Sequence, residues 1–217
     1  MTDQKLLKRS LFELIAAPLA NHGFKLKTAK DSFLRKHDSE TDIFQLVCLD
    51  GKPGWRIQPN VAVRIERVEA IFHQTSGFEP KYQSDTPTIG GFVGNIADGD
   101  NRACEFLLED NRDLSLVAGN IVNVFIQIGL PYFDKFRSIS EIDKELNSSP
   151  TERTPHRVAP WLRCSTGVIV AKLSGRPDYG ELVEIYLDVI RKSDKGFYLR
   201  RFEALLQSLE SVHAEAG

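Results

Sequence analysis

The apolar residues of this chain switch from strand-like to helical spacing after an N-terminal helix, and that order limits the folds open to the chain. From Phe24 to Ile65 they recur mainly at every second position, the pattern of strands with one covered face. From Leu114 to the end they recur at helical spacing. Strands that are followed by helices favour an α+β protein. We therefore expect a mostly antiparallel sheet after an N-terminal helix, packed by a C-terminal group of helices.

The N-terminal helix is predicted over residues 4–21. Thr2 or Asp3 can cap its start, Pro18 disturbs its last turn, and Gly23 supplies a left-handed stop. The apolar positions that define its buried face are Leu7, Leu11, Leu14, Ile15, Pro18 and Leu19.

The sheet is predicted from short runs joined by turns, which favour antiparallel pairing. Residues 43–49 are apolar on both faces, so we place this strand centrally. A helix near Phe72 and a long polar loop at 76–100 follow, with a weak strand at 89–93 inside the loop. The other predicted strands are 24–27, 33–36, 55–65 and 104–108.

The helical part begins with a wide apolar stripe at 114–128. Gly129 and Pro131 are expected to stop that helix, and the aromatic residues behind them to fasten the two parts of the molecule. A ligand groove there, near Tyr132, is the alternative. Residues 162–173 fit a strand or a helix, and we predict a helix. The remaining predicted helices are 138–146, 182–190 and 202–212, which gives two parts, 1–137 and 138–217, packed as one compact unit.

The charge balance disfavours strong nucleic-acid binding as a general property. Up to Leu130 the chain has 15 Lys/Arg and 17 Asp/Glu, and beyond it 13 of each. Neither part has the basic excess of a protein that neutralises many phosphates. A local basic stripe stays possible, because a net charge hides clustering.

The compartment is predicted to be the cytoplasm. The start of the chain reads as an amphipathic helix interrupted by Glu13 rather than as a signal peptide. No stretch approaches the length of a membrane span. The odd number of widely spaced cysteines, Cys48, Cys104 and Cys164, argues for a reducing environment.

The best candidate for a binding surface is the polar face of the strand at 55–65. Its alternation places several polar side chains on one side, where rigid strands would present them to a protein surface or to nucleic acid. Lys25 and Lys27 extend this face if the strand order allows. The predicted binding residues are Trp55, Arg56, Gln58, Asn60, Arg64 and, at the aromatic turn, Tyr132.

The sequence gives no catalytic signature, and no cofactor or metal is predicted. The acidic turn at 98–101 lacks the ligand spacing of a calcium loop, and the glycines at 90–94 lack a Walker lysine. The histidines lack the helical spacing of a metal site. Dispersed residues near the sheet–helix junction are the fallback for an enzyme, with His73, Asp85 and Asp98 as the first mutations.

The segments LFELIAAPLANHGFKLK, SFLRK and IFQLV, with the later Gly129-Leu130-Pro131-Tyr132-Phe133 turn, resemble a bacterial family known as domain of unknown function 4304. That resemblance implies a compact α+β protein of bacterial origin and carries no catalytic residue with it. The resemblance also implies an immunity role, since some small bacterial proteins of this type travel with toxin or defence genes as immunity partners.

We therefore predict a non-catalytic cytoplasmic protein that binds an unidentified protein partner, in an immunity-type or accessory role. An enzyme with a dispersed site is the alternative, and nucleic-acid binding is third. The sequence leaves the oligomeric state open.

Overall fold

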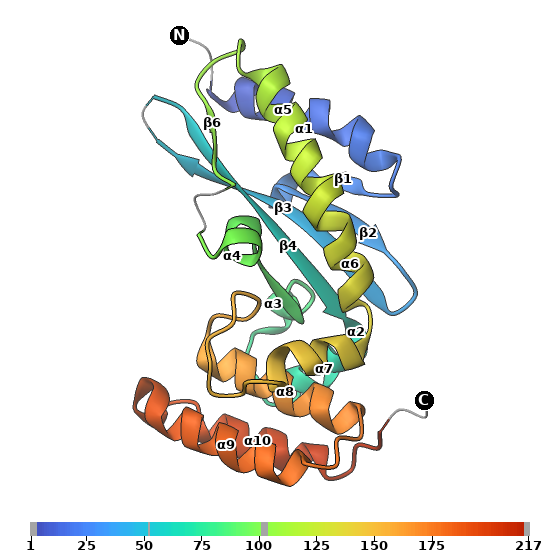
Figure 1. Ribbon diagram of the computed structural model, residues 1–217, viewed down its shortest axis with the longest axis vertical. Helices are drawn as coiled ribbons and strands as arrows, with labels where there is room; N and C mark the ends of the chain where they lie inside the picture. The colour runs from blue at the N-terminus through green and yellow to red at the C-terminus, as the bar shows by residue number, and fades with distance from the viewer. Residues whose placement is uncertain (1–3, 52, 101–103, 215–217) are drawn as a thin grey trace. The chain divides into compact units, whose positions relative to one another are not determined.

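The computed structural model describes residues 4–51, 53–100 and 104–214, and it confirms an α+β architecture with an antiparallel sheet (Figure 1). The chain forms two compact units, residues 1–63 with 90–134 and residues 64–89 with 135–217. The predicted division lies once along the chain, after residue 137, whereas residues 64–89 join the C-terminal part. Hydrophobic spacing reveals a helix in this segment but does not say which core the helix enters.

The first unit contains a helix, the sheet and a long second helix. In the sheet the strands follow the order β1-β2-β3-β4-β5, and β6 pairs with β4. The element bounds are α1 Gln4–Ala20, β1 Lys25–Lys27, the 3-10 turn η1 Thr28–Lys30, β2 Ser32–Lys36, β3 Glu40–Asp50, β4 Trp55–Ile65, β5 Ile89–Phe92, α4 Val93–Asp98, β6 Phe106–Leu108, α5 Leu114–Val124, the π-helical turn η2 Phe125–Gly129 and α6 Leu130–Phe136; β4, β5 and α6 run across the unit boundaries.

The register of the sheet pairs apolar residues across neighbouring strands. The antiparallel pairing of β2 with β3 sets Phe33 opposite Phe44, and that of β4 with β6 sets Trp55 opposite Leu108. Gly90 lets β5 approach β4, because a Cβ at this position would lie 2.5 Å from the Cβ of Ala62. The central position predicted for residues 43–49 is confirmed by β3, which lies between β2 and β4.

Helices α1 and α5 lie side by side over one face of the sheet (Figure 1). Phe12 of α1 stacks on Phe33 at 5.8 Å between ring centroids. Leu14 was expected on the buried face but is 47% exposed, and Phe12 takes its place at 4%. Gly23 ends α1 in the left-handed region as predicted, at φ +83°. The predicted caps Thr2 and Asp3 lie outside the described residues.

The prediction that Gly129 and Pro131 end a helix is wrong. The helix is continuous from Leu114 to Phe136, because the π-helical turn η2 widens the backbone just before the proline. Gly129 is absent from the glycines with positive φ. The resulting 23-residue helix is long and apolar enough to cross a membrane by length and composition, against our expectation of no such stretch, and only 28% of its most apolar window is buried.

The second unit is helical. Its core is α8, where residues 163–171 are all buried, and α8 packs against α2, α7, α9 and α10. Its elements are α2 Glu66–His73, α3 Pro80–Gln83, α7 Ile139–Asn147, α8 Pro160–Leu173, α9 Tyr179–Lys192, the 3-10 turn η3 Ser193–Gly196 and α10 Leu199–Leu209. The helix predicted at 162–173 is thus confirmed. The later helices build a core of their own with α2, whereas we expected them to cover the sheet.

Arg163 fixes the stretch after α7, which reads as a linker in the sequence. Its guanidinium donates to the backbone carbonyls of Leu146, Ser149 and Glu152. The long polar loop is also more ordered than predicted, since residues 76–100 contain α3, the expected strand β5 and α4.

Candidate functional site

The predicted binding face on β4 does not form one exposed surface. Gln58 is buried and its amide donates to Glu105 at 2.7 Å. Arg64 is buried in the second unit, where it pairs with Glu66 at 2.8 Å and donates to the carbonyl of Thr86 at 2.7 Å. Neither side chain is presented to a partner. Strand alternation predicted which residues share a face but not that this face is covered as well.

The remaining predicted binding residues are dispersed. Arg56 is exposed, Asn60 is half-buried, and Tyr132 is buried beside Phe133. Trp55 points to the α1 side of the sheet, where its indole N–H donates to the carbonyl of Gln4 at 3.0 Å. Trp55 leads to a groove along α1, because the ammonium of Lys8, which lines that groove, lies 5.4 Å above the Trp55 ring. The largely buried Arg64 lines a second pocket of about 360 Å³ in its own unit, together with His73.

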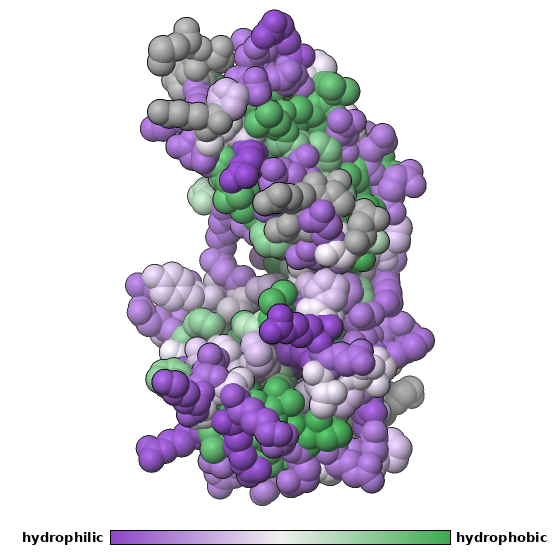
Figure 2. All heavy atoms as spheres, turned by 60° about the vertical axis from the view of Figure 1, so that its left-hand side comes forward, coloured by the Kyte–Doolittle hydropathy of each residue, from purple (hydrophilic) through white to green (hydrophobic). Residues whose placement is uncertain are grey.

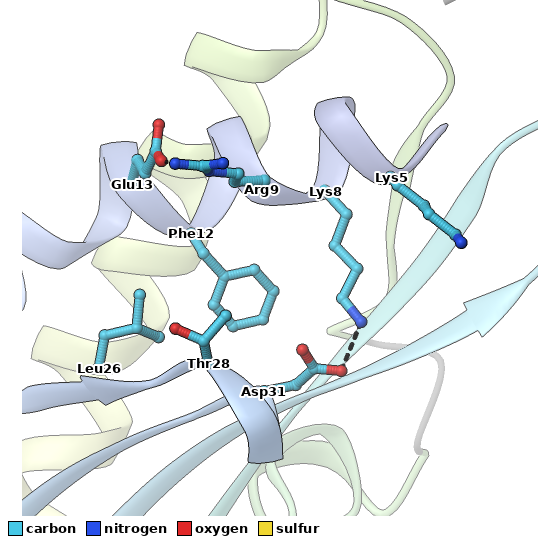
Figure 3. Close-up of a pocket in the computed structure, with 8 residues that line it drawn as sticks. All are labelled: Lys5, Lys8, Arg9, Phe12, Glu13, Leu26, Thr28 and Asp31. Atoms are coloured by element: carbon cyan, nitrogen blue, oxygen red, sulfur yellow. Dashed lines mark hydrogen bonds and ion pairs between the residues drawn. The ribbon is translucent and has the colours of Figure 1, made fainter. Parts of the chain in front are cut away.

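A groove of about 510 Å³ runs along α1 in the first unit (Figure 3). One wall is α1 and the other is formed by β1, η1 and the start of β2. In the close-up, the ring of Phe12 points from α1 toward Leu26 and Thr28, and the three form an apolar floor. The other lining residues are Lys5, Lys8, Arg9, Glu13 and Asp31.

The rim of this α1–β1 groove is basic. Lys8 reaches across it to Asp31, with 2.5 Å between Nζ and Oδ2, and Arg9 pairs with Glu13 at 2.8 Å along the helix (Figure 3). Exposed lysines continue the charge on β1 and η1 at Lys25, Lys27 and Lys30. Residues 4–36 hold eight Lys/Arg and two Asp/Glu, an excess of six positive charges. The groove therefore favours a negatively charged ligand.

Strand β1 lies at the edge of the sheet. Its three residues, Lys-Leu-Lys, pair with β2, and within the described part of the chain no strand pairs with the other side of β1, so a further strand could be added there. Edge lysines commonly prevent indiscriminate pairing, and that role accounts for Lys25 and Lys27 without any ligand. It does not account for an apolar floor and basic helix side chains beside the same edge.

A second polar cluster lies in the other unit and contains His73. Glu69 is fully buried and accepts hydrogen bonds from the hydroxyls of Thr86 at 2.6 Å and Thr88 at 2.9 Å. His73 contacts Thr86 through Nε2 at 2.7 Å and Ser76 through Nδ1 at 2.9 Å. Because Thr86 gives its only proton to Glu69, His73 must donate from Nε2 and accept from Ser76 at Nδ1.

This hydroxyl relay resembles the order of groups in a catalytic triad, but its geometry suits packing. Ser76 is 3% exposed, and its oxygen also accepts the backbone N–H of Phe78 at 3.2 Å. Asp85, expected beside His73, is exposed and bonded to Ser84. Asp98 belongs to the other unit. The relay joins the end of α2 to the following turn, which is a structural role.

The pKa of His73 gives a test of this relay. Burial and the neighbouring Arg64 cation lower the pKa of His73, so its contribution to stability is complete above the unfolded value of about 6.5 and is lost as the pH falls through the folded value. We expect the free energy of unfolding to fall below pH ~6.5 by at most about 1.4 kcal/mol per pH unit from this group.

The measurement is urea unfolding between neutral and mildly acidic pH. His73→Gln should flatten the slope. His156→Gln is the necessary companion, because burial also lowers the pKa of His156 and acts in the same direction. Glu69 opposes both, since burial raises its pKa. An unchanged slope in His73→Gln would show that His73 does not titrate with folding.

Cys48 and Cys164 offer no alternative nucleophile at neutral pH. Burial raises the pKa of Cys48 to about 11 and that of Cys164 to about 12, so both are thiols rather than thiolates. In the described part of the chain, no three His, Cys, Asp or Glu side chains are grouped so as to hold a metal ion.

No protein-family model, curated protein or solved structure matches this chain. The resemblance to domain of unknown function 4304 therefore stays a prediction that its short motifs alone carry.

Sequence reasoning missed the α1–β1 groove. Lys5 and Arg9 are exposed on α1, where lysine and arginine are ordinary solvent-facing residues, whereas the half-buried Lys8 lies beside the aliphatic stripe with its ammonium over the rings of Phe12 and Trp55. One signal was present: residues 4–36 concentrate positive charge while the chain as a whole is near neutrality. The closing of the groove depends on Asp31, whose left-handed backbone at φ +47° turns η1 into β2, and no local pattern predicts that turn.

Proposed function

We propose that this protein is a non-catalytic binding protein whose α1–β1 groove takes an extended, acidic segment of a partner protein. The observation that carries the proposal is the position of the groove: an apolar floor and a basic rim lie directly beside an open sheet edge. An added strand would satisfy the free backbone groups of β1, and alternate side chains would enter the groove.

The chemistry of the lining supports binding rather than turnover. It consists of two ion pairs, an apolar floor, the hydroxyl of Thr28 and Lys5. A general acid–base catalyst needs a group that titrates near the working pH, and histidine and cysteine are not among the lining residues. Basic side chains around an apolar floor recognise carboxylates and exclude cationic competitors.

The partner class comes from two separate arguments. Charge selects an acidic segment, because the groove lining holds three cations and two carboxylates and three exposed lysines follow on β1 and η1. The resemblance to domain of unknown function 4304 adds an immunity-type or accessory role in a cytoplasmic setting. Preference for an acidic segment is tested with defined peptides. The immunity-type or accessory role is tested by the identity of the natural partner.

The first test is fluorescence anisotropy with a labelled peptide of alternating glutamate and valine. We expect saturable binding that weakens by at least about tenfold in the double variant Lys5→Glu and Arg9→Glu, since each reversal replaces attraction by repulsion. The matched control is Lys81→Glu with Lys144→Glu, which reverses two exposed charges of the second unit that do not line the groove. An equal loss of peptide affinity in both double variants would show that the net charge of the protein, and not the groove, determines binding.

If the peptide adds to the sheet as a strand, binding must also depend on the backbone N–H groups of the peptide. N-methylation removes backbone donors without changing the charge of the peptide. Methyl groups on the edge that pairs with β1 should abolish binding, whereas methyl groups on the opposite edge should leave it unchanged. If both N-methylated peptides bind as tightly as the unmethylated one, strand addition is contradicted and binding is due to charge alone.

A further inference from the structure

The second unit carries an exposed aromatic surface that the α1–β1 groove does not explain. Phe197 is 70% exposed, a large apolar ring left in solvent. It follows η3, in which Asp194, Lys195 and Gly196 all have positive φ. In Figure 2, hydrophobic atoms lie among hydrophilic side chains on the face that shows the α9–α10 pair.

The ring of Phe197 is held by other aromatic residues. It meets Tyr198 edge-on at 4.9 Å, and Tyr198 stacks on Trp161 at 4.5 Å with only 6° between the ring planes. The guanidinium of Arg201 lies 5.9 Å from the Phe197 ring and 6.0 Å from the Tyr198 ring. Phe197 is therefore an anchored ring beside a planar cation.

Arg201 is itself positioned by the backbone of the loop after α2. Gly77 has φ +73°, and a Cβ at this residue would lie 2.9 Å from the guanidinium carbon of Arg201. The glycine thus leaves the space that the guanidinium fills. This contact lies within the second unit.

The surface is also the most basic short segment of the chain. Residues 191–201, RKSDKGFYLRR, hold five Lys/Arg and one Asp, and no other window of eleven residues has as large an excess. All five cationic residues are exposed. Lys192 pairs with Asp188 at 2.6 Å, which leaves Arg191, Lys195, Arg200 and Arg201 as the cations for a ligand.

We infer that residues 191–201 bind single-stranded nucleic acid, with Phe197 stacking on a base and the surrounding cations contacting phosphates. A nucleotide chain offers a planar ring and a negative charge in every repeat, and this surface presents a planar ring among cations. A purely acidic chain matches the cations but offers no planar ring for Phe197. The net charge of the whole chain is close to zero, which disfavours nucleic-acid binding as a general property, but this value conceals the local excess of positive charge at residues 191–201.

The test uses the full chain with labelled oligothymidylate at low ionic strength. Binding should weaken with salt at a slope near −3 in log–log form, because about four phosphates are neutralised at about 0.7 each. Phe197→Ala should weaken binding by at least about fivefold, the lower limit for loss of one stacked base. Leu116→Ala, which truncates another exposed apolar side chain at 68% exposure, is the control and should change nothing.

Three other probes separate this surface from its alternatives. Duplex DNA of the same length should bind more weakly, because its bases are not available for stacking. Polyglutamate that binds as tightly as the oligonucleotide, with no effect of Phe197→Ala, would overturn the inference in favour of charge alone. Binding to phosphatidylserine vesicles but not to oligothymidylate would overturn it in favour of a membrane surface, and absence of oligonucleotide binding at low salt would overturn it outright.

The two surfaces can be tested independently. The Lys5→Glu and Arg9→Glu variant should keep oligonucleotide binding, and Phe197→Ala should keep binding of the acidic peptide. Loss of both activities in either variant would indicate unfolding, which circular dichroism detects.

Discussion

Phe125→Ala should lower the free energy of unfolding of the first unit by about 3–5 kcal/mol, the usual cost of truncating a fully buried phenylalanine. Phe125 is 0% exposed and sits in the π-helical turn η2. Its ring meets Phe24 at 5.0 Å, Phe44 at 5.2 Å and Phe133 at 6.4 Å. Alanine would leave a cavity where the two helical segments meet the sheet.

The two tryptophans make this measurement specific, because Trp55 belongs to the first unit and Trp161 to the second. In a Trp161→Phe background, urea unfolding followed by fluorescence reports on the first unit alone. Leu116→Ala on the same long helix is the control and should cost less than about 0.5 kcal/mol, since it is an exposed substitution. A loss below about 1 kcal/mol in Phe125→Ala would mean that this aromatic cluster is not the core.

Asp42→Ala should cost a similar amount, about 3–5 kcal/mol, because it removes one partner of a buried ion pair. The Asp42 side chain is 0% exposed, and its Oδ2 accepts from Arg35 at 2.7 Å and contacts Nε2 of His37 at 2.9 Å. Arg35 is also held over the ring of Phe24 at 4.7 Å, so it cannot simply turn to solvent.

The comparison that isolates burial is Glu13→Ala. It removes another arginine–carboxylate pair of nearly the same length, but both partners are well exposed, at 73% for Arg9 and 59% for Glu13. Exposed pairs of this kind contribute about 0–1 kcal/mol. Asp42→Asn, which keeps the shape without the charge, should fall between the two. Equal losses in Asp42→Ala and Glu13→Ala would refute a structural role for the buried pair.

Hydrophobic spacing predicted most elements because each element has one covered face. The helix at 162–173 was recovered although Val168, Ile169 and Val170 favour strands, since helical patterns flank it and α8 is buried all round. Local patterns failed where the outcome depends on distant partners. Gly129 and Pro131 read as a stop, yet the π-helical turn absorbs the proline.

The candidate sites were harder to predict for the same reason. Gln58 and Arg64 are polar residues on one face of a strand, and only tertiary structure brings Glu105 to Gln58 and the carbonyl of Thr86 to Arg64, which occupies both side chains inside the protein. The groove residues Phe12 and Leu26 come from different elements. Their proximity follows from the return of the chain at Gly23, which the sequence indicates, and from the register of β1, which it does not.

The most direct test of a binding role for the α1–β1 groove is a nitrogen-15 NMR titration of the full chain with the glutamate–valine peptide. If the peptide adds a strand, the amides of residues 25–27 should shift and become protected from hydrogen exchange, together with shifts along the groove side of α1. Saturation without protection at β1, or with the largest shifts elsewhere, would contradict it.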